Sequence, residues 1–153
     1  MTAMKQSFAA WGRLIRLNRR VTGARTIGVA SISIRTENFV AEMANHFPSL
    51  GPVLTVHKED NFRTILPHVF LGDVTRWVVG LVAVATAAEI LRNRKQLTSV
   101  LSYLEDAYNA GDEELQELIS VSFLENLPRP GERGSEVRQM VGSALSAQLK
   151  VIG

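Results

Sequence analysis

The sequence of 153 residues contains no cysteine. This absence excludes disulfide bonds, thiolate metal sites and cysteine nucleophiles. It is also typical of a reducing compartment, and we expect the protein to be cytoplasmic. The hydrophobic fraction of 46% and the charged fraction of 21% are those of a globular domain with a substantial core, and they argue against a disordered chain.

Long apolar runs are also absent. The most apolar stretch, residues 77–91, is shorter than the roughly 20 residues that a transmembrane helix needs. The N-terminus lacks the apolar run and small-residue cleavage site of a secretory signal. We therefore expect no transmembrane segment, and we interpret this stretch as a central buried helix capped by Asp73.

Acidic residues are missing from residues 1–35, where arginine is frequent, so all 15 of them lie in the rest of the chain. We predict a basic N-terminal arm at residues 1–35 and a single helical domain at residues 36–153. The arm could bind nucleic-acid phosphates or an anionic membrane surface. The arginines that would do so are Arg13, Arg16, Arg19 and Arg20. A mitochondrial transit peptide and an extension that docks by Trp11 are the alternatives for the same segment.

Apolar residues recur at helical spacing along most of the chain, which predicts an all-α fold: a compact bundle of about five or six helices. The clearest signal lies at residues 93–127. Gly111 is expected to end one helix there in the left-handed conformation, and Asp112 to cap the next. Because the connection is short, we expect a C-terminal antiparallel helical hairpin.

The remaining elements are predicted from weaker patterns. A helix is expected over residues 4–20, followed by a linker or short strand over residues 21–35. Thr36 is expected to cap a helix that ends near His46, and residues 47–56 are expected to form a loop. A short helix should follow from Glu59. Its inward residues would be Phe62, Ile65, Leu66 and Val69. Ser135 is expected to cap a last helix that buries Val137, Met140, Val141 and Leu145.

The motifs of catalysis are absent as well. His46, His57 and His68 are evenly spaced, but prolines prevent one continuous helix between them and no H-E-x-x-H pattern exists. We therefore expect no metal site and partly exposed histidines at helix ends. There is also no nucleophile elbow and no phosphate-binding loop. We expect no catalytic residues, no cofactor and no enzymatic activity; a hydrolase with an unrecognised carboxylate pair is the alternative.

Residues 105–125 carry only acidic charges. A solvated helix face is the simplest explanation of this acidic strip. The functional interpretation is a surface complementary to a basic partner, because opposite charge steers encounter and sets specificity. The candidate contacts are Glu105, Asp106, Asp112, Glu113, Glu114 and Glu117.

Three motifs together resemble a known group of proteins. They are L-P-H-V-F-L-G-D-V-T-R-W at residues 66–77, L-x-x-L-E-D-A-Y-x-x-G-D-E-E-L at residues 101–115 and I-S-V-S-F-L-E-N-L at residues 119–127. The set is similar to a bacterial family of small helical domains of unknown function, some members of which resemble immunity proteins that neutralise a sister toxin. The hairpin also has HEAT-like character. Glu125 and Asn126 are expected to bind backbone groups at the hairpin's end.

The resemblance and the acidic strip lead us to expect a non-enzymatic, helical protein-binding domain. The resemblance implies an immunity protein whose partner is a basic toxin domain. The alternative is a protein that associates with nucleic acid or a membrane through its basic arm. Removal of residues 1–35 would distinguish the two, because only the second depends on the arm.

Overall fold

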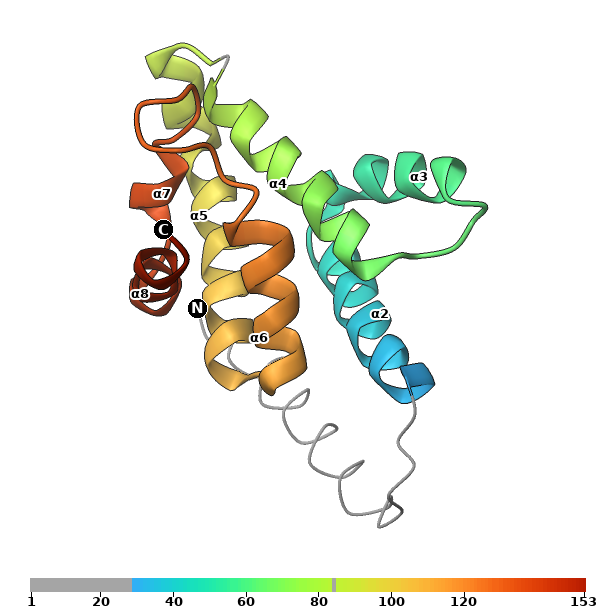
Figure 1. The fold of residues 1–153 in the computed structure, drawn as a ribbon. Coiled ribbons are helices and arrows are strands. Elements are labelled where there is room, and N and C mark those ends of the chain that lie inside the picture. The colour runs from blue at the N-terminus through green and yellow to red at the C-terminus, as the bar shows by residue number, and fades with distance from the viewer. Residues whose placement is uncertain (1–28, 84) are drawn as a thin grey trace.

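The computed structural model describes residues 29–83 and 85–153, which fold into helices joined by turns (Figure 1). The all-α class is confirmed, and no strand occurs in these residues. The α-helices are α2 (Val29–His46), α3 (Gly51–Asp60), α4 (Pro67–Ala83), α5 (Ala87–Ala110), α6 (Glu113–Ile119), α7 (Val137–Met140) and α8 (Ser143–Ile152). A short 3-10 turn, η1 (Pro48–Leu50), joins α2 to α3, and a π-helical turn, η2 (Ser120–Leu124), continues α6.

Helix α4 is the central element, as its apolar sequence predicts. It contacts α2, α3, α5, α6, α7 and η2, and it buries Phe70, Leu71, Val74 and Val78 completely. Its predicted bounds were wrong at both ends. The helix begins at Pro67, because proline lacks an N–H that the first turn would leave unbonded, and Asp73 therefore lies inside the helix and does not cap it.

The apolar stretch at residues 77–91 is divided between two helices, and a capping box marks the division. The Thr86 side chain accepts a hydrogen bond from the backbone N–H of Glu89 at 3.3 Å, and the Glu89 carboxylate accepts one from the backbone N–H of Thr86 at 2.7 Å. This reciprocal pair satisfies N–H groups that the first turn of α5 leaves free, so a new helix begins here. The sequence T-A-A-E at residues 86–89 was the signal that sequence analysis missed.

The predicted antiparallel hairpin is confirmed as α5 and α6, which lie side by side in Figure 1. Asp112 caps α6 by accepting a hydrogen bond from the N–H of Leu115 at 3.2 Å. The left-handed conformation expected of Gly111 was wrong, since its φ is −75°. Glycine is needed there for space: a Cβ atom would lie 2.6 Å from the carbonyl oxygen of Ala107.

The N-terminal half of the described chain is more helical than the sequence suggested. Helix α2 begins at Val29, so Thr36 is not its cap and residues 29–35 are neither linker nor strand; its end at His46 is confirmed. The predicted loop at residues 47–56 was wrong, because Pro48 and Pro52 occupy first turns of η1 and α3. The predicted arm helix at residues 4–20 and Trp11 lie outside the described residues.

The predicted last helix is two helices, and Ser135 caps neither of them. The chain is extended between them at Val141 and Gly142, and the N-terminus of α8 is bonded to Glu105 of α5. The Glu105 carboxylate accepts hydrogen bonds from the N–H groups of Ala144 at 2.7 Å and Leu145 at 3.0 Å. A Cβ atom at Gly142 would lie 2.4 Å from the Glu105 carboxyl carbon, so glycine allows this approach.

We expect Glu105→Ala to lower the free energy of unfolding by about 1–2 kcal/mol, because it leaves two N–H groups of α8 without an acceptor. Urea denaturation measures the change. Asp106→Ala is the matched control, since Asp106 is the neighbouring carboxylate and is exposed. Equal stability of the two variants would show that Glu105 does not hold α8.

Tyr103 of α5 is buried in an aromatic cluster with residues of α2 and the turn that follows it. Its ring centroid lies 5.9 Å from that of Phe39 and 5.3 Å from those of His46 and Phe47. Burial raises the pKa of Tyr103 to about 12, and the negative charge of Glu42 adds to the increase. The cluster therefore favours a neutral phenol between α2 and α5.

The raised pKa of Tyr103 makes the fold sensitive to alkali. The phenol of an unfolded chain ionises near pH 10, so we expect stability to decline as pH rises from about 10 to about 12. Tyr103→Phe should remove this part of the decline. Denaturation midpoints measured across that range would contradict the assignment if wild type and variant declined in parallel.

Candidate functional site

The turn between α3 and α4, residues 61–66, projects away from the other helices (Figure 1). We call it the α3–α4 turn. Phe62 at its tip is 97% exposed, whereas periodicity had placed it inward. Phe62 and Arg63 have φ values of 54° and 62°, in the left-handed region that disfavours residues with a side chain. Such conformations cost on the order of 1–3 kcal/mol each and persist only where the surroundings hold them.

Backbone hydrogen bonds hold the tip in this conformation. The N–H of Arg63 donates to the carbonyl oxygen of Lys58 at 2.7 Å, and the N–H of Thr64 donates to that of Asn61 at 2.9 Å. The first of these spans five residues, as in the turn that commonly ends a helix with glycine. Here Phe62 and Arg63 occupy the positions where glycine is usual. The backbone is therefore strained at the point where an aromatic ring is exposed to solvent.

A buried histidine fixes the other end of the turn. His57 of α3 is 1% exposed, so the expected partly exposed histidine was wrong at this position. Its Nε2 atom accepts a hydrogen bond from the backbone N–H of Leu66 at 3.0 Å, and its Nδ1 atom lies 2.9 Å from the Asp73 carboxylate of α4. Because an N–H can only donate, the ring proton must be on Nδ1, where it bonds to Asp73. Asp73 also pairs with Arg76.

This geometry excludes His57 as a general base. A base paired with a carboxylate needs a free second ring nitrogen, and that atom of His57 is occupied by the Leu66 amide. The described residues also contain a serine–histidine pair, His68 and Ser122, with 2.6 Å between Nδ1 and Oγ. Ser122 is 3% exposed, and its histidine is not the one that carries the carboxylate. A catalytic triad needs a carboxylate and a hydroxyl bonded to one histidine. Here the carboxylate contacts His57 and the hydroxyl contacts His68, so no triad is formed by these residues.

Ser122 instead belongs to a structural contact between α4 and η2. The carbonyl oxygen of Ser122 accepts hydrogen bonds from the Thr75 hydroxyl at 3.2 Å and from the Asn126 amide at 3.0 Å. The π-helical turn makes this oxygen available to side chains. The expected backbone binding by Asn126 is therefore confirmed, and the contact brings the motifs at residues 66–77 and 119–127 together.

The residues of the acidic strip differ in their surroundings. Glu105 caps α8, and Asp112 caps α6 while accepting a hydrogen bond from Arg35 of α2 at 3.0 Å. Glu114 lies 3.8 Å from the same guanidinium group. The exposed members are Asp106, Glu113, Glu117 and Glu125. The structure thus uses Glu105, Asp112 and Glu114 within the fold and leaves the other four on the surface.

The alternative site in the arm, formed by Arg13, Arg16, Arg19 and Arg20, lies outside the described residues. In residues 29–83 and 85–153, no cluster of histidine and acidic side chains could hold a metal ion. Within the same ranges, none of the helices has both the length and the apolar character needed to cross a bilayer.

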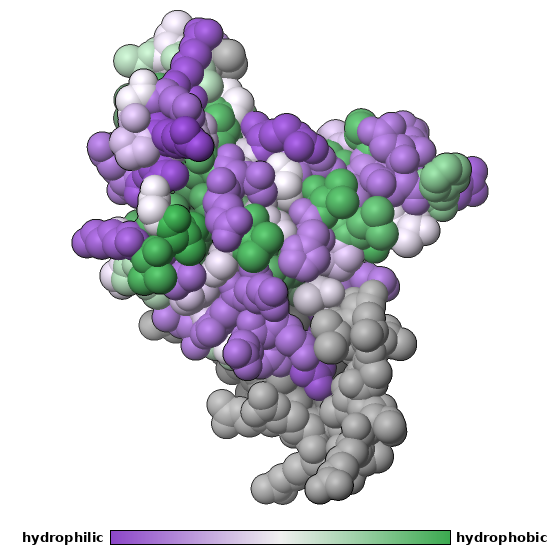
Figure 2. Space-filling model, viewed as in Figure 1, coloured by the Kyte–Doolittle hydropathy of each residue, from purple (hydrophilic) through white to green (hydrophobic). Residues whose placement is uncertain are grey.

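Apolar side chains accompany Phe62 near the α3–α4 turn. Val56 is 55% exposed, and Leu66 and Val69 are also exposed. A shallow groove at the tip is lined by Thr55, Lys58, Glu59, Phe62 and Arg63. In Figure 2 this projecting turn carries apolar and charged side chains together. Asn61, a residue common in turns, was the available sequence signal that the helix ends before Phe62.

The fold and these sites define an all-helical domain arranged around one central helix. Residues 40–152 match the model of a family described as a domain of unknown function, DUF7674, and the protein belongs to that family. No curated protein and no solved structure matches the chain. The expected resemblance to a family of unknown function is confirmed, while its bacterial origin and its link to immunity proteins stay predictions.

We expect His57→Ala to lower the free energy of unfolding by about 3 kcal/mol. The change leaves the Leu66 N–H without an acceptor, removes one of the two partners of the Asp73 carboxylate and opens a cavity beside Phe70. Glu59→Ala, an exposed position of the same helix, is the control and should change stability by less than about 0.5 kcal/mol. A loss below about 1 kcal/mol for His57→Ala in urea denaturation would contradict the role assigned to the imidazole.

Proposed function

We propose that this protein is a non-enzymatic binding domain that recognises another protein by inserting Phe62 into an apolar pocket of that partner. The observation that carries the proposal is the 97% exposure of Phe62 on a backbone with φ of 54°. An exposed aromatic residue on an ordinary helix needs no explanation. A strained turn that presents one does, because the strain lowers stability without contributing to the core.

The energetics of such a contact are favourable. Burial of a phenylalanine side chain contributes about 1.5–3 kcal/mol, and aromatic and arginine side chains are the residues that most often dominate interfaces. Phe62 is adjacent to Arg63. The hydrogen bonds to Lys58 and His57 order the turn before a partner arrives, so binding does not have to supply that ordering.

The role of an immunity protein fits this arrangement. A side chain that projects from an inhibitor can fill a toxin's active-site pocket, and Phe62 projects in this way from the α3–α4 turn. The exposed acidic residues Asp106, Glu113 and Glu117 would attract a basic partner such as a nuclease domain. The family resemblance and the remaining acidic surface support this role; the anchor at Phe62 is proposed independently of them.

The test begins by replacing Phe62 with a photo-reactive benzoylphenylalanine in the full chain, in cells of the natural host. The same residue at Leu91, an exposed position on α5, is the control. A protein captured from position 62 and not from position 91 would then be purified, and its affinity for the wild-type chain measured by calorimetry. The proposal requires direct binding between the two purified proteins.

A matched pair of variants connects binding to Phe62 itself. We expect Phe62→Gly to relieve the left-handed strain and raise the free energy of unfolding by up to about 1 kcal/mol. The same change should lower the affinity for the partner at least tenfold. Arg63→Gly relieves the neighbouring strain but keeps the aromatic ring. This variant should therefore bind the partner substantially more tightly than the Phe62→Gly variant does. Unchanged affinity in Phe62→Gly would overturn the proposal, as would a partner released only by neutralising Asp106, Glu113 and Glu117.

A further inference from the structure

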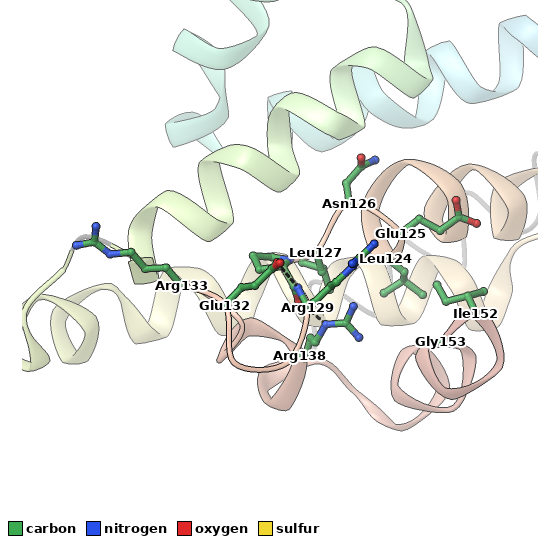
Figure 3. A pocket seen from close by; sticks show the side chains of 11 residues that line it. Leu124, Glu125, Asn126, Leu127, Arg129, Glu132, Arg133, Arg138, Ile152 and Gly153 are labelled. Atoms are coloured by element: carbon green, nitrogen blue, oxygen red, sulfur yellow. Dashed lines mark hydrogen bonds between the residues drawn. The ribbon is translucent and has the colours of Figure 1, made fainter.

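A second surface lies far along the sequence from the α3–α4 turn, where the segment after η2 meets α7 and the end of α8. It is a groove of about 840 Å³, within the size range of small-molecule sites. Figure 3 shows Arg129 and Arg138 among the residues that line it, with Leu124 and Ile152 close by. We call it the Arg129–Arg138 groove.

Both arginines line this groove, and each is anchored by a hydrogen bond. The Nε atom of Arg138 donates a hydrogen bond to the carbonyl oxygen of Pro128 at 2.6 Å, which fixes the plane of its guanidinium group. The backbone N–H of Arg129 donates to the Glu132 carboxylate at 2.7 Å, which fixes the turn that carries the Arg129 side chain. Both terminal nitrogens of Arg138 and the whole Arg129 guanidinium group are left for a ligand.

No carboxylate in the described part of the chain forms an ion pair with either arginine. The Glu132 carboxylate is engaged by the Arg129 backbone, and Figure 3 shows that of Glu125 directed away from both guanidinium groups. Two like charges that point into one groove repel each other, and a bound anion would offset that repulsion. The planar donor fork of arginine suits the oxygens of a phosphate or a carboxylate.

Part of the groove's lining is apolar. Pro128 and Ile152 are half-buried and present apolar atoms to it, while Leu124 and Leu127 are buried in the core at its base. A bare inorganic ion would leave the surfaces of Pro128 and Ile152 in contact with water. From these features we infer that the Arg129–Arg138 groove binds a small organic anion in which a phosphate or carboxylate group is attached to an apolar body.

The test uses three probes with the full chain, in calorimetry and in NMR titrations that follow the side-chain Nε–H signals of the arginines. Phenyl phosphate and phenylpropionate carry the two anionic groups on the same apolar body, and inorganic phosphate lacks that body. We expect at least one organic probe to bind with a dissociation constant on the order of 1 mM or lower, and inorganic phosphate to bind at least tenfold more weakly. Selective binding of one organic probe identifies its anionic group as the one recognised.

Two variants separate this site from general charge attraction. Arg129→Met should lower the affinity for the organic probe about tenfold or more. It should not lower stability, because this guanidinium group makes no bond within the described fold. Arg133→Met is the matched control. Arg133 lines the same groove, but its Nε atom donates to the carbonyl oxygen of Ala83 at 2.9 Å and its side chain points away from the other two arginines in Figure 3.

The inference is overturned if neither organic probe shifts the Arg129 and Arg138 signals, or if Arg133→Met weakens binding as much as Arg129→Met does. Binding of inorganic phosphate as tight as that of phenyl phosphate would also overturn it, because the apolar part of the lining would then contribute nothing to affinity. These outcomes are independent of Phe62, which lies in the α3–α4 turn and does not line this groove.

Discussion

The hydrogen bonds of one buried imidazole determine how the proposed binding turn is presented. His57 joins three parts of the chain: the helix that it belongs to, the backbone of Leu66 before α4, and Asp73 within α4. Each bond depends on the others, because the proton given to Asp73 leaves Nε2 free to accept from Leu66. With both ends of the turn fixed, the residues between them can hold a conformation that a flexible loop would avoid.

Helix α4 connects the His57 contacts to the rest of the molecule. Its Asp73 bonds to His57 of α3, and its Thr75 and His68 bond to Ser122 in the π-helical turn. The chain that leaves that turn then forms the base of the Arg129–Arg138 groove. Both proposed sites therefore lie on segments adjoining the same central helix, one before it and one after the turn that packs against it. Rigid support of this kind is what positions exposed functional side chains.

Much of the fold could be predicted because local physical chemistry decides it. The α5–α6 hairpin follows from apolar spacing and from Asp112, whose cap involves only residues close in sequence. Errors occurred where a distant partner decides the local structure. Asp73 has the chemistry of a cap, but its partner is His57, sixteen positions away. The sequence around Glu105 predicts a surface charge, and only the packing of α8 shows that this carboxylate caps a helix.

The candidate sites were harder to predict than the fold for the same reason. Helical spacing placed Phe62 in the core because it was counted through Asn61, whereas α3 ends at Asp60. Nor does the sequence reveal that Arg129 and Arg138 line the same groove, since this depends on the carbonyl oxygen of Pro128 and on the position of α8. The acidic strip was visible, yet which of its members bond within the fold and which are exposed depends on the packing of α2, α6 and α8.

The central claim is that the α3–α4 turn is a rigid support for an exposed aromatic ring. Backbone ¹⁵N relaxation of the free protein tests it most directly, through the order parameters of Phe62 and Arg63. Rigid presentation predicts values near 0.85, like those of the helices on either side. Values below about 0.6 would show a flexible loop and would contradict both the stored strain and the pre-organised anchor.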